Sequence, residues 1–322
     1  MIEQIIKAPD GHEIQTYVWP NENAKAWIHI FHGMAEHAKR YDLLAQELVA
    51  QGYAVVAHNH RGHGTSSTTI LGQFAHNNGW QKVLDDLETV RTVICDEPHQ
   101  KALSYYILGH SMGSFIAQSY LTGNARHIDG VILSASNLQN VFMSQAGKQV
   151  ANIEAFRLGA DKNSKLLQFL SFGSFNNHFK PSRTEFDWLS RDQKEVDKYI
   201  ADSLCGFACS VSLWQDFLHA LAKLFKTGSL NKVQANLPIL IMGGDQDPVG
   251  LMGKGLPKLA NHYQTSGQKN VTLKLYPGAR HELLNETNRS EVMSDTLNWL
   301  NALNTREISP PLVHQSNKKN AH

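Results

Sequence analysis

The chain has 322 residues, enough for one large α/β domain with a substantial apolar core, and two unrelated domains fit this length less well. Its 30 basic and 29 acidic residues give a net charge of +1, so a nucleic-acid-binding groove is not indicated. No stretch reaches the roughly 18 apolar residues of a membrane span, and the opening residues predict no signal peptide. Three cysteines are too few for a disulfide framework, which suits a reducing compartment. We expect a cytoplasmic protein whose contact with the inner membrane face is at most peripheral.

Short apolar runs alternate along the chain with helix-length amphipathic stretches. Two segments, 3–8 and 12–20, predict an antiparallel pair at one edge of a sheet. The later runs that predict strands are 26–33, 53–64, 105–111, 130–136, 238–247 and 271–281. Between the first four of these lie helical patterns at 40–52, 79–97 and 111–123. This order predicts βα units around a mostly parallel central sheet flanked by helices.

The alternation stops after Ser136. Residues 137–223 contain no convincing strand. They hold several helical patterns, notably one over 195–225 that runs two residues past this segment, and a phenylalanine-rich stretch at 165–181. We predict a helical cap over 137–223, inserted after the sixth strand, and a core formed by 1–136 and 224–304. The phenylalanines also fit ordinary packing between helices. The polar residues 305–322 predict a flexible C-terminal tail.

The pentapeptide Gly-His-Ser-Met-Gly at 109–113 follows a predicted strand and precedes a predicted helix. This is the context of a nucleophile elbow, a strained turn that exposes a serine and needs glycines on either side of it. A plain tight turn is the alternative. The placement favours Ser111 as a nucleophile.

A serine hydroxyl becomes nucleophilic when an imidazole removes its proton and a carboxylate orients that imidazole. In this architecture the order along the chain is serine, acid, histidine. Asp245 and Asp247 follow one late strand, and His281 follows the next. Asp247 could also form a turn before Pro248, and Asp245 could cap that turn. The order predicts His281 as the base and one of these two aspartates as its partner.

The remaining requirement is a pair of backbone N–H groups that stabilise the oxyanion of the tetrahedral intermediate. Met112 directly follows the predicted nucleophile, and we expect its backbone N–H to be one of these donors. Met34 lies beside Gly33 in the loop after the first core strand and predicts the other.

The chain resembles the α/β-hydrolases of the monoacylglycerol lipase and bacterial lysophospholipase type. The similarity runs through "FHGMAEHAKRY" (31–41), "HRGHGTS" (60–66), "GHSMGS" (109–114), "GGDQDPV" (243–249) and "PGARHELLNE" (277–286), and the cap segment 186–207 looks like the bacterial branch. It covers most of residues 1–303. The resemblance implies the α/β-hydrolase fold, with Ser111 as nucleophile, Asp247 rather than Asp245 as acid, His281 as base, and Met34 and Met112 as oxyanion donors.

One position departs from the family, because Asn59 stands where an aspartate is usual before "HRGHG". An amide keeps local hydrogen bonding and drops a charge, so we expect altered loop electrostatics and intact chemistry. His58, His60 and His63 suggest a zinc site, since imidazole is a common ligand. The family's loop explains them without a metal, and we predict no metal and no cofactor.

Cys205 and Cys209 lie four residues apart and could share a helix face. Buried apolar packing explains them better than metal ligation. Cys95 is the remaining cysteine.

These features predict a serine hydrolase that cleaves carboxylic esters of monoacyl lipids, lysophospholipid or monoacylglycerol, through an acyl-enzyme on Ser111. The substrate is a small amphipathic acyl ester, with the cap as the source of apolar area for the acyl chain. One alternative is a carboxylesterase of short soluble esters or amides with the same triad. Another is a ligand-binding relative without catalysis.

Overall fold

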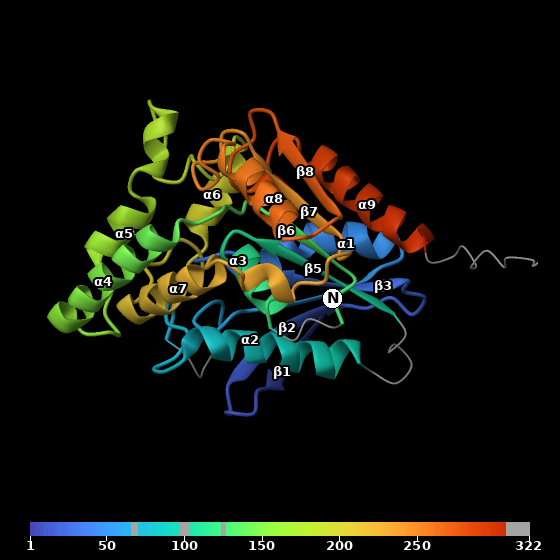
Figure 1. Ribbon diagram of the computed structural model, residues 1–322, viewed down its shortest axis with the longest axis horizontal. Coiled ribbons are helices and arrows are strands. Elements are labelled where there is room, and N and C mark those ends of the chain that lie inside the picture. Colours follow the sequence, from blue (N-terminus) through green and yellow to red (C-terminus); the bar gives the residue numbers. More distant parts are fainter. Residues whose placement is uncertain (66–69, 97–102, 124–126, 307–322) are drawn as a thin grey trace, which may run out of the picture.

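The computed structural model describes residues 1–65, 70–96, 103–123 and 127–306. Within these residues eight strands form one sheet, in the order β1-β2-β4-β3-β5-β6-β7-β8 (Figure 1). The strands are β1 (Ile2–Lys7), β2 (Glu13–Trp19), β3 (Ala26–Phe31), β4 (Ala54–His58), β5 (Ser104–His110), β6 (Gly130–Ser134), β7 (Ile239–Gly244) and β8 (Val271–Tyr276). β2 runs antiparallel to β1 and β4, and the other neighbours are parallel. The predicted mostly parallel sheet and its antiparallel edge are confirmed.

Helices cover both faces of the sheet because its central strands are apolar on both sides. Every residue of β3 is buried, as expected of a central parallel strand. Trp27 and Phe31 belong to the core cluster that also contains residues of α2 (Gly79–Val90), α3 (Met112–Leu121) and α8 (Gly255–Thr265). Ile28 and Ile30 belong to the cluster on the opposite face of the sheet. The helices of the core are α1 (Asp42–Ala50), α2 (Gly79–Val90), α3 (Met112–Leu121), α8 (Gly255–Thr265) and α9 (Arg289–Arg306).

Four helices are inserted between β6 and β7: α4 (Val141–Leu158), α5 (Lys165–Phe172), α6 (Gln193–Ala201) and α7 (Val211–Leu224). Residues 135–238 are all described, and they contain no strand. α7 contacts α4 and also α2 and α3 of the core, whereas α4 and α5 lie at one end of the molecule (Figure 1). None of the helices described is long and apolar enough to span a bilayer. The insertion follows the sixth strand, as predicted.

The structure differs from the predicted helix and tail boundaries at two places. The helical pattern at 195–225 is divided, because α6 ends at Ala201 and α7 begins at Val211. In the connection, Asp202 accepts a hydrogen bond from Leu204 N at 2.8 Å, and Gly206 has a φ of +66°, which helical backbone does not allow. At the other boundary α9 includes the first two residues of the predicted tail, and 307–322 lie outside the described residues.

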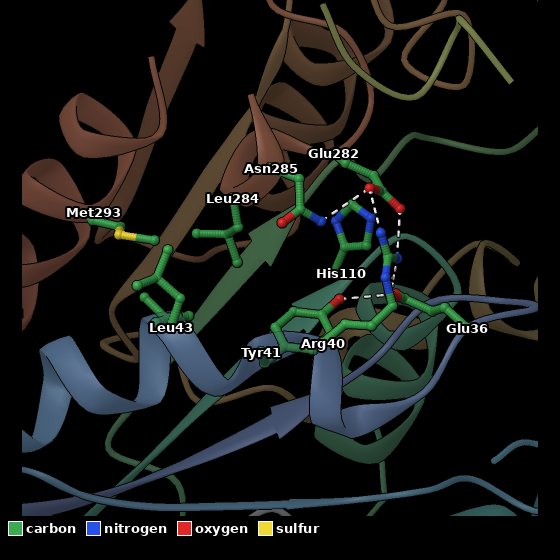
Figure 2. Close-up of a pocket in the computed structure, with 10 residues that line it drawn as sticks. Glu36, Arg40, Tyr41, Leu43, His110, Glu282, Leu284, Asn285 and Met293 are labelled. Carbon is green, nitrogen blue, oxygen red and sulfur yellow. Dashed lines mark hydrogen bonds and ion pairs between the residues drawn. The ribbon is translucent and has the colours of Figure 1, made fainter. Parts of the chain in front are cut away.

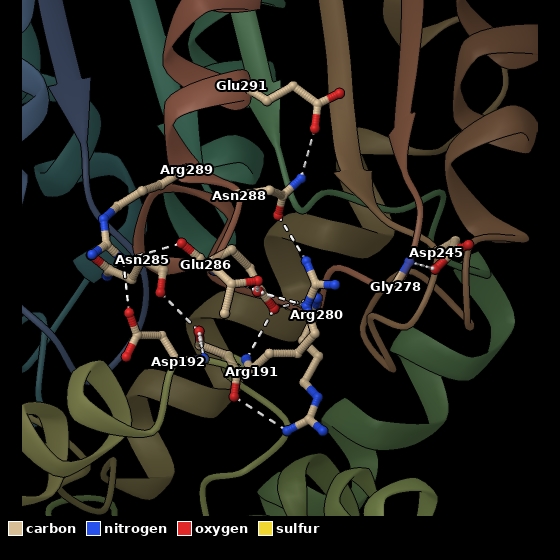
Figure 3. A network of polar contacts seen from close by, with 12 residues as sticks. Arg191, Asp192, Asp245, Gly278, Arg280, Asn285, Glu286, Asn288, Arg289 and Glu291 are labelled. Atoms are coloured by element: carbon tan, nitrogen blue, oxygen red, sulfur yellow. Dashed lines mark hydrogen bonds and ion pairs between the residues drawn. The ribbon is translucent and has the colours of Figure 1, made fainter.

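The carboxyl ends of the parallel strands meet at one edge of the sheet, where loops from distant parts of the chain come together. Glu286, in the loop after β8, lies at the centre of a polar network there (Figure 3). Its buried carboxylate accepts hydrogen bonds from the backbone N–H groups of Arg191 and Arg280 and from Nε of Arg191 at 2.9–3.1 Å. Arg191 belongs to the inserted segment, so Glu286 fastens that segment to the core.

We predict that Glu286→Ala strongly destabilises the protein, because it leaves Nε of Arg191 and several backbone N–H groups without their acceptor. The loss for breaking such a pair is about 3–5 kcal/mol in the free energy of unfolding, measured by urea denaturation. The control is Glu47→Ala on the exposed face of α1, which should change that free energy by less than about 0.5 kcal/mol. Equal losses in the two variants would contradict the role given to Glu286.

Candidate active site

Ser111 lies on a sharp turn between β5 and α3. Its backbone has a φ of +51° and a ψ of −118°, a conformation that a residue with a side chain rarely adopts. A Cβ atom on Gly109 would lie 2.5 Å from the carbonyl oxygen of Gly113, and one on Gly113 would overlap the carbonyl oxygen of Phe31. The two glycines are therefore required by close backbone approach, and the turn has the geometry predicted for a nucleophile elbow.

His281 and Asp247 form a buried pair. Nδ1 of His281 lies 3.0 Å from both carboxylate oxygens of Asp247, and the exposed fractions of the two residues are 3% and 0%. An ionised carboxylate only accepts hydrogen bonds, so Nδ1 carries the proton and Nε2 keeps a free lone pair. This is the tautomer that a general base needs.

The structure also distinguishes the two candidate aspartates. Asp245 accepts a hydrogen bond from the backbone N–H of Gly278 at 2.8 Å and thereby supports the loop after β8. Asp247 is oriented by the backbone N–H of Val249, which donates to Oδ1 at 2.9 Å. The carboxylate that contacts His281 is therefore that of Asp247.

The pKa of His281 is raised above its ordinary value of 6.5. Burial has the largest effect and lowers this pKa, but the charge and hydrogen bond of Asp247, together with the charges of Glu282 and Glu36, raise it by more in total. Next in the chain to Ser111, His110 has its pKa lowered to about 4, mainly by burial. Of these two neighbouring imidazoles, whose ring centres lie 5.0 Å apart, His281 is the one suited to accept a proton.

Ser111 and His281 line the same cavity, of about 670 Å³, which lies between the core and the inserted helices. The loop after β3 contributes Gly33 and Met34 to its wall. Its aromatic and aliphatic side chains come mainly from the inserted segment, which also contributes charged ones such as Lys165, Arg183 and Glu185. The apolar ones from this segment are Phe169, Phe172, Phe186, Trp188, Leu189, Tyr199 and Phe207.

The two predicted oxyanion donors both belong to segments that adjoin the serine. Met112 is the first residue of α3, so its N–H is among those that a helix leaves without an internal acceptor. Met34 follows Gly33, where a Cβ atom would lie 3.4 Å from Cβ of Ser111 and 2.7 Å from Oε1 of Glu36. Glycine at this position lets the loop approach the serine closely.

A buried ionic network joins the loop after β3 to the loop after β8 (Figure 2). The sequence analysis did not predict it. The guanidinium of Arg40 contacts both carboxylate oxygens of Glu282 at 2.7 Å and Oε2 of Glu36 at 2.6 Å. Glu36 in turn accepts from the backbone N–H of Gly33 at 2.5 Å and from the hydroxyl of Tyr41 at 2.9 Å. Arg40 thus joins the loop of Met34 to the residue that follows His281.

The four-residue spacing of Glu36 and Arg40 suggests an ion pair on a helical turn. The other partner of Arg40, Glu282, is more than 240 positions away along the chain, and no local pattern identifies it.

The cap segment also holds the histidine loop. The backbone N–H of His281 donates to the carbonyl of Trp188 at 3.4 Å, and that of Glu282 donates to Leu189 at 2.7 Å. The indole of Trp188 lies 5.0 Å from the imidazole of His281, centre to centre. Local sequence patterns do not reveal this contact, because residues 187–192 follow no helical or strand period.

The histidines considered as zinc ligands are used in packing and hydrogen bonding. Nδ1 of His58 lies 2.9 Å from Nε2 of His29, and Nδ1 of His63 lies 3.0 Å from the carbonyl oxygen of Arg61. The ring of His60 stacks beside that of His32 at 4.2 Å. Burial lowers the pKa of His58 to about 3 and that of His63 to about 4, so both rings are neutral at physiological pH.

Comparison with known proteins places the chain in a family. Residues 22–288 match the hydrolase family described as "Serine aminopeptidase, S33". Monoglyceride lipase of Rattus norvegicus is 30% identical over 303 residues, covering 93% of this chain and 89% of the relative. Monoacylglycerol lipase of Mycolicibacterium smegmatis is 26% identical and covers 90% of this chain and 93% of the relative.

A solved structure supports the same fold. A thermostable carboxyl esterase from Bacillus coagulans, in complex with glycerol, has a TM-score of 0.86 at 24% identity, over 94% of this chain and 98% of that one. The chain therefore belongs to the Serine aminopeptidase S33 family of α/β-hydrolases, and its sequence is similar to monoglyceride lipases of that fold.

Proposed function

We propose that the protein is a serine hydrolase that cleaves the carboxylic ester of monoacyl lipids, with monoacylglycerol as the favoured substrate class and lysophospholipid as the alternative. The observation that carries the proposal is the apolar cavity, which has an elbow serine and a carboxylate-paired histidine in its wall. The similarity to monoglyceride lipases over 93% of the chain supports the substrate class.

In the proposed reaction Nε2 of His281 takes the proton of the Ser111 hydroxyl, whose oxygen attacks the ester carbonyl. The N–H groups of Met34 and Met112 stabilise the oxyanion, and Asp247 stabilises the imidazolium. The alcohol leaves with the proton from His281, and an acyl-enzyme remains on Ser111. Water then enters, gives a proton to His281, and attacks the acyl carbon. The bond to Ser111 breaks, His281 returns the proton to the Ser111 oxygen, and the fatty acid is released.

The inserted helices provide the apolar surface for the acyl chain. Each buried methylene contributes roughly 0.8 kcal/mol, so a chain of eight further carbons gains several kcal/mol over a short acyl group. Such a gain is realised only if the chain lies along the aromatic wall formed by residues such as Phe172 and Trp188.

The substrate class is tested with purified protein and three sets of compounds: monoacylglycerols and lysophosphatidylcholines of graded acyl length, p-nitrophenyl esters of the same lengths, and aminoacyl p-nitroanilides. We expect kcat/KM to rise with acyl length and to be highest for monoacylglycerol. Ser111→Ala should abolish turnover and labelling by a fluorophosphonate probe.

The same experiment separates the alternatives. Values of kcat/KM that fall steadily with acyl length would identify an esterase of short soluble esters. Cleavage of the anilides alone would identify an aminopeptidase, the activity in the family's description. An absence of labelling in the wild type would favour a ligand-binding relative without catalysis.

The pH dependence of hydrolysis follows from the His281–Asp247 pair. The base must be neutral to accept a proton, and its pKa is raised above 6.5, so activity should fall as the pH drops through a midpoint above 6.5. In Asp247→Asn the charge of Asp247, the largest effect that raises this pKa, is lost, so the midpoint of kcat/KM should move to lower pH while kcat falls on the order of 10⁴-fold. Asp245→Asn is the matched control and should keep the wild-type midpoint. If Asp245→Asn shifted the midpoint and Asp247→Asn did not, the acid would be Asp245 instead of Asp247.

We also propose weak peripheral contact of the protein with a membrane through α4 and α5, in the reducing cytoplasmic compartment that its three free cysteines suit. Phe142, Ile153 and Phe156 of α4 are 75%, 64% and 96% exposed, and intervals of 11 and 14 residues place them on one helix face. Phe169 and Leu170 of α5 are 65% and 59% exposed. Apolar helix faces of this kind bind at the lipid interface.

Sedimentation with phosphatidylcholine vesicles tests this contact. The double variant Phe142→Ser/Phe156→Ser removes two exposed rings, and we expect its vesicle partition coefficient to fall at least about tenfold. Ile2→Ser, on the distant edge strand β1, removes an exposed apolar side chain elsewhere and should bind as the wild type does. Unchanged binding of the double variant would place the contact on another surface.

A further inference from the structure

A second group of reactive side chains lies where the cap meets the loop after β3. His37 comes from that loop, Asp202 follows the last residue of α6, and Cys205 lies in the connection to α7. One ligand atom from each of the three lies within 4.8 Å of the others. Nε2 of His37 and Oδ2 of Asp202 are already 2.8 Å apart. Among the residues that the structure describes, this is the group whose ligand atoms converge in this way.

We propose that His37, Asp202 and Cys205 form a zinc-binding site. Imidazole, carboxylate and thiolate are all ligands of Zn²⁺, at distances of about 2.0–2.3 Å, which puts tetrahedral ligand atoms about 3.3–3.8 Å apart. Small side-chain rotations bring the three atoms to this spacing. On binding, Zn²⁺ replaces the proton of the Cys205 thiol, which is released to solvent, and a water molecule completes the tetrahedron.

The surroundings of Cys205 favour a cation. Besides the ligand Asp202, the carboxylates of Glu36 and Glu282 act on it electrostatically, and the single guanidinium of Arg40, which pairs with both, offsets only part of their charge. The site is also sheltered, since Cys205 is 9% exposed and His37 is 8% exposed. A net negative site with two buried ligands, one of them a soft thiolate, and the partly exposed Asp202 selects a borderline-soft divalent ion over Mg²⁺ or Ca²⁺.

The site lies on an existing junction between cap and core. The backbone N–H of Gly206 donates to the carbonyl of Ala35 at 2.9 Å, and the hydroxyl of Tyr199 donates to the same oxygen at 3.0 Å. The contact between His37 and Asp202 is a third link, and a bound ion replaces this hydrogen bond with metal bonds that also include Cys205. Zinc therefore stabilises the folded chain by closing the cap onto the core, independently of the chemistry at Ser111.

The test uses tag-free protein treated with a chelator and then titrated with ZnCl₂ against a chromogenic zinc indicator. We expect one zinc ion per chain and a rise in the thermal unfolding midpoint with zinc concentration. Cys205→Ala should weaken zinc binding at least tenfold and remove the thermal shift. Cys209→Ala is the matched control, because it removes a buried thiol four residues away that lies outside the group, and it should bind zinc as the wild type does.

Two further measurements keep the result decisive. Co²⁺ bound to the wild type should give a near-ultraviolet thiolate charge-transfer band, which needs no variant. If Cys205→Ala does not fold, Asp202→Asn takes its place. The proposal is overturned if the wild type binds no zinc, if Co²⁺ gives no such band, or if the substituted protein binds as tightly as the wild type. The assay is run in parallel on Ser111→Ala, so its outcome does not depend on the proposed hydrolysis.

Discussion

The hydrogen-bonded pair of His281 and Asp247 is the interaction on which the arrangement of the site depends. Both residues are nearly inaccessible, so the carboxylate cannot be replaced by water as the partner of Nδ1. The imidazole sits in a loop of only a few residues after β8, and such a loop does not hold a ring in one orientation by itself. The surrounding structure supplies the missing constraints from three directions.

The loop from His281 to Glu286 is fixed by the cap, by the first core loop and by its own carboxylates. Trp188 and Leu189 accept its backbone N–H groups, Arg40 binds Glu282, and Glu286 binds Arg191. Buried charged pairs of this kind cost desolvation energy and contribute little net stability, but breaking one is expensive. Their effect here is to make the position of the base depend on the intact junction of cap and core.

This dependence limits how the cap can move. Displacement of residues 188–191 breaks hydrogen bonds to the same loop that carries His281, so this part of the cap and the His281–Asp247 pair form one structural unit. The outer helices α4 and α5 lack such ties to the loop in the described structure, and α4 packs mainly on α7. Entry of a lipid is therefore expected beside α5, whose residues Phe169 and Phe172 line the cavity.

The sequence predicted the sheet from local patterns. It also predicted that Ser111, His281 and Asp247 lie at one sheet edge, where the structure pairs His281 with Asp247 and places Ser111 and His281 in the wall of one cavity. Apolar runs of strand length alternate with helical periods, and residues placed after parallel strands must meet at one sheet edge. The contacts of Arg40 with Glu282 and of Glu286 with Arg191 join segments about 95–240 residues apart, and no period in the chain encodes them. The division of 195–225 into two helices was missed because its apolar spacing continues through the Gly206 turn.

Asn59 shows how a departure from a family pattern can be accommodated by hydrogen bonding alone. Its side-chain oxygen accepts from the backbone N–H of Ala38 at 2.9 Å, and its amide nitrogen donates to Oε1 of Gln15 at 2.6 Å. The residue is 4% exposed, so a carboxylate here would need a cation close by. The nearest guanidinium in the sequence, that of Arg61, is already engaged by Asp10 and Asp86. A neutral amide satisfies both partners without burying an unpaired charge, which explains why the loop keeps its structure with asparagine at this position.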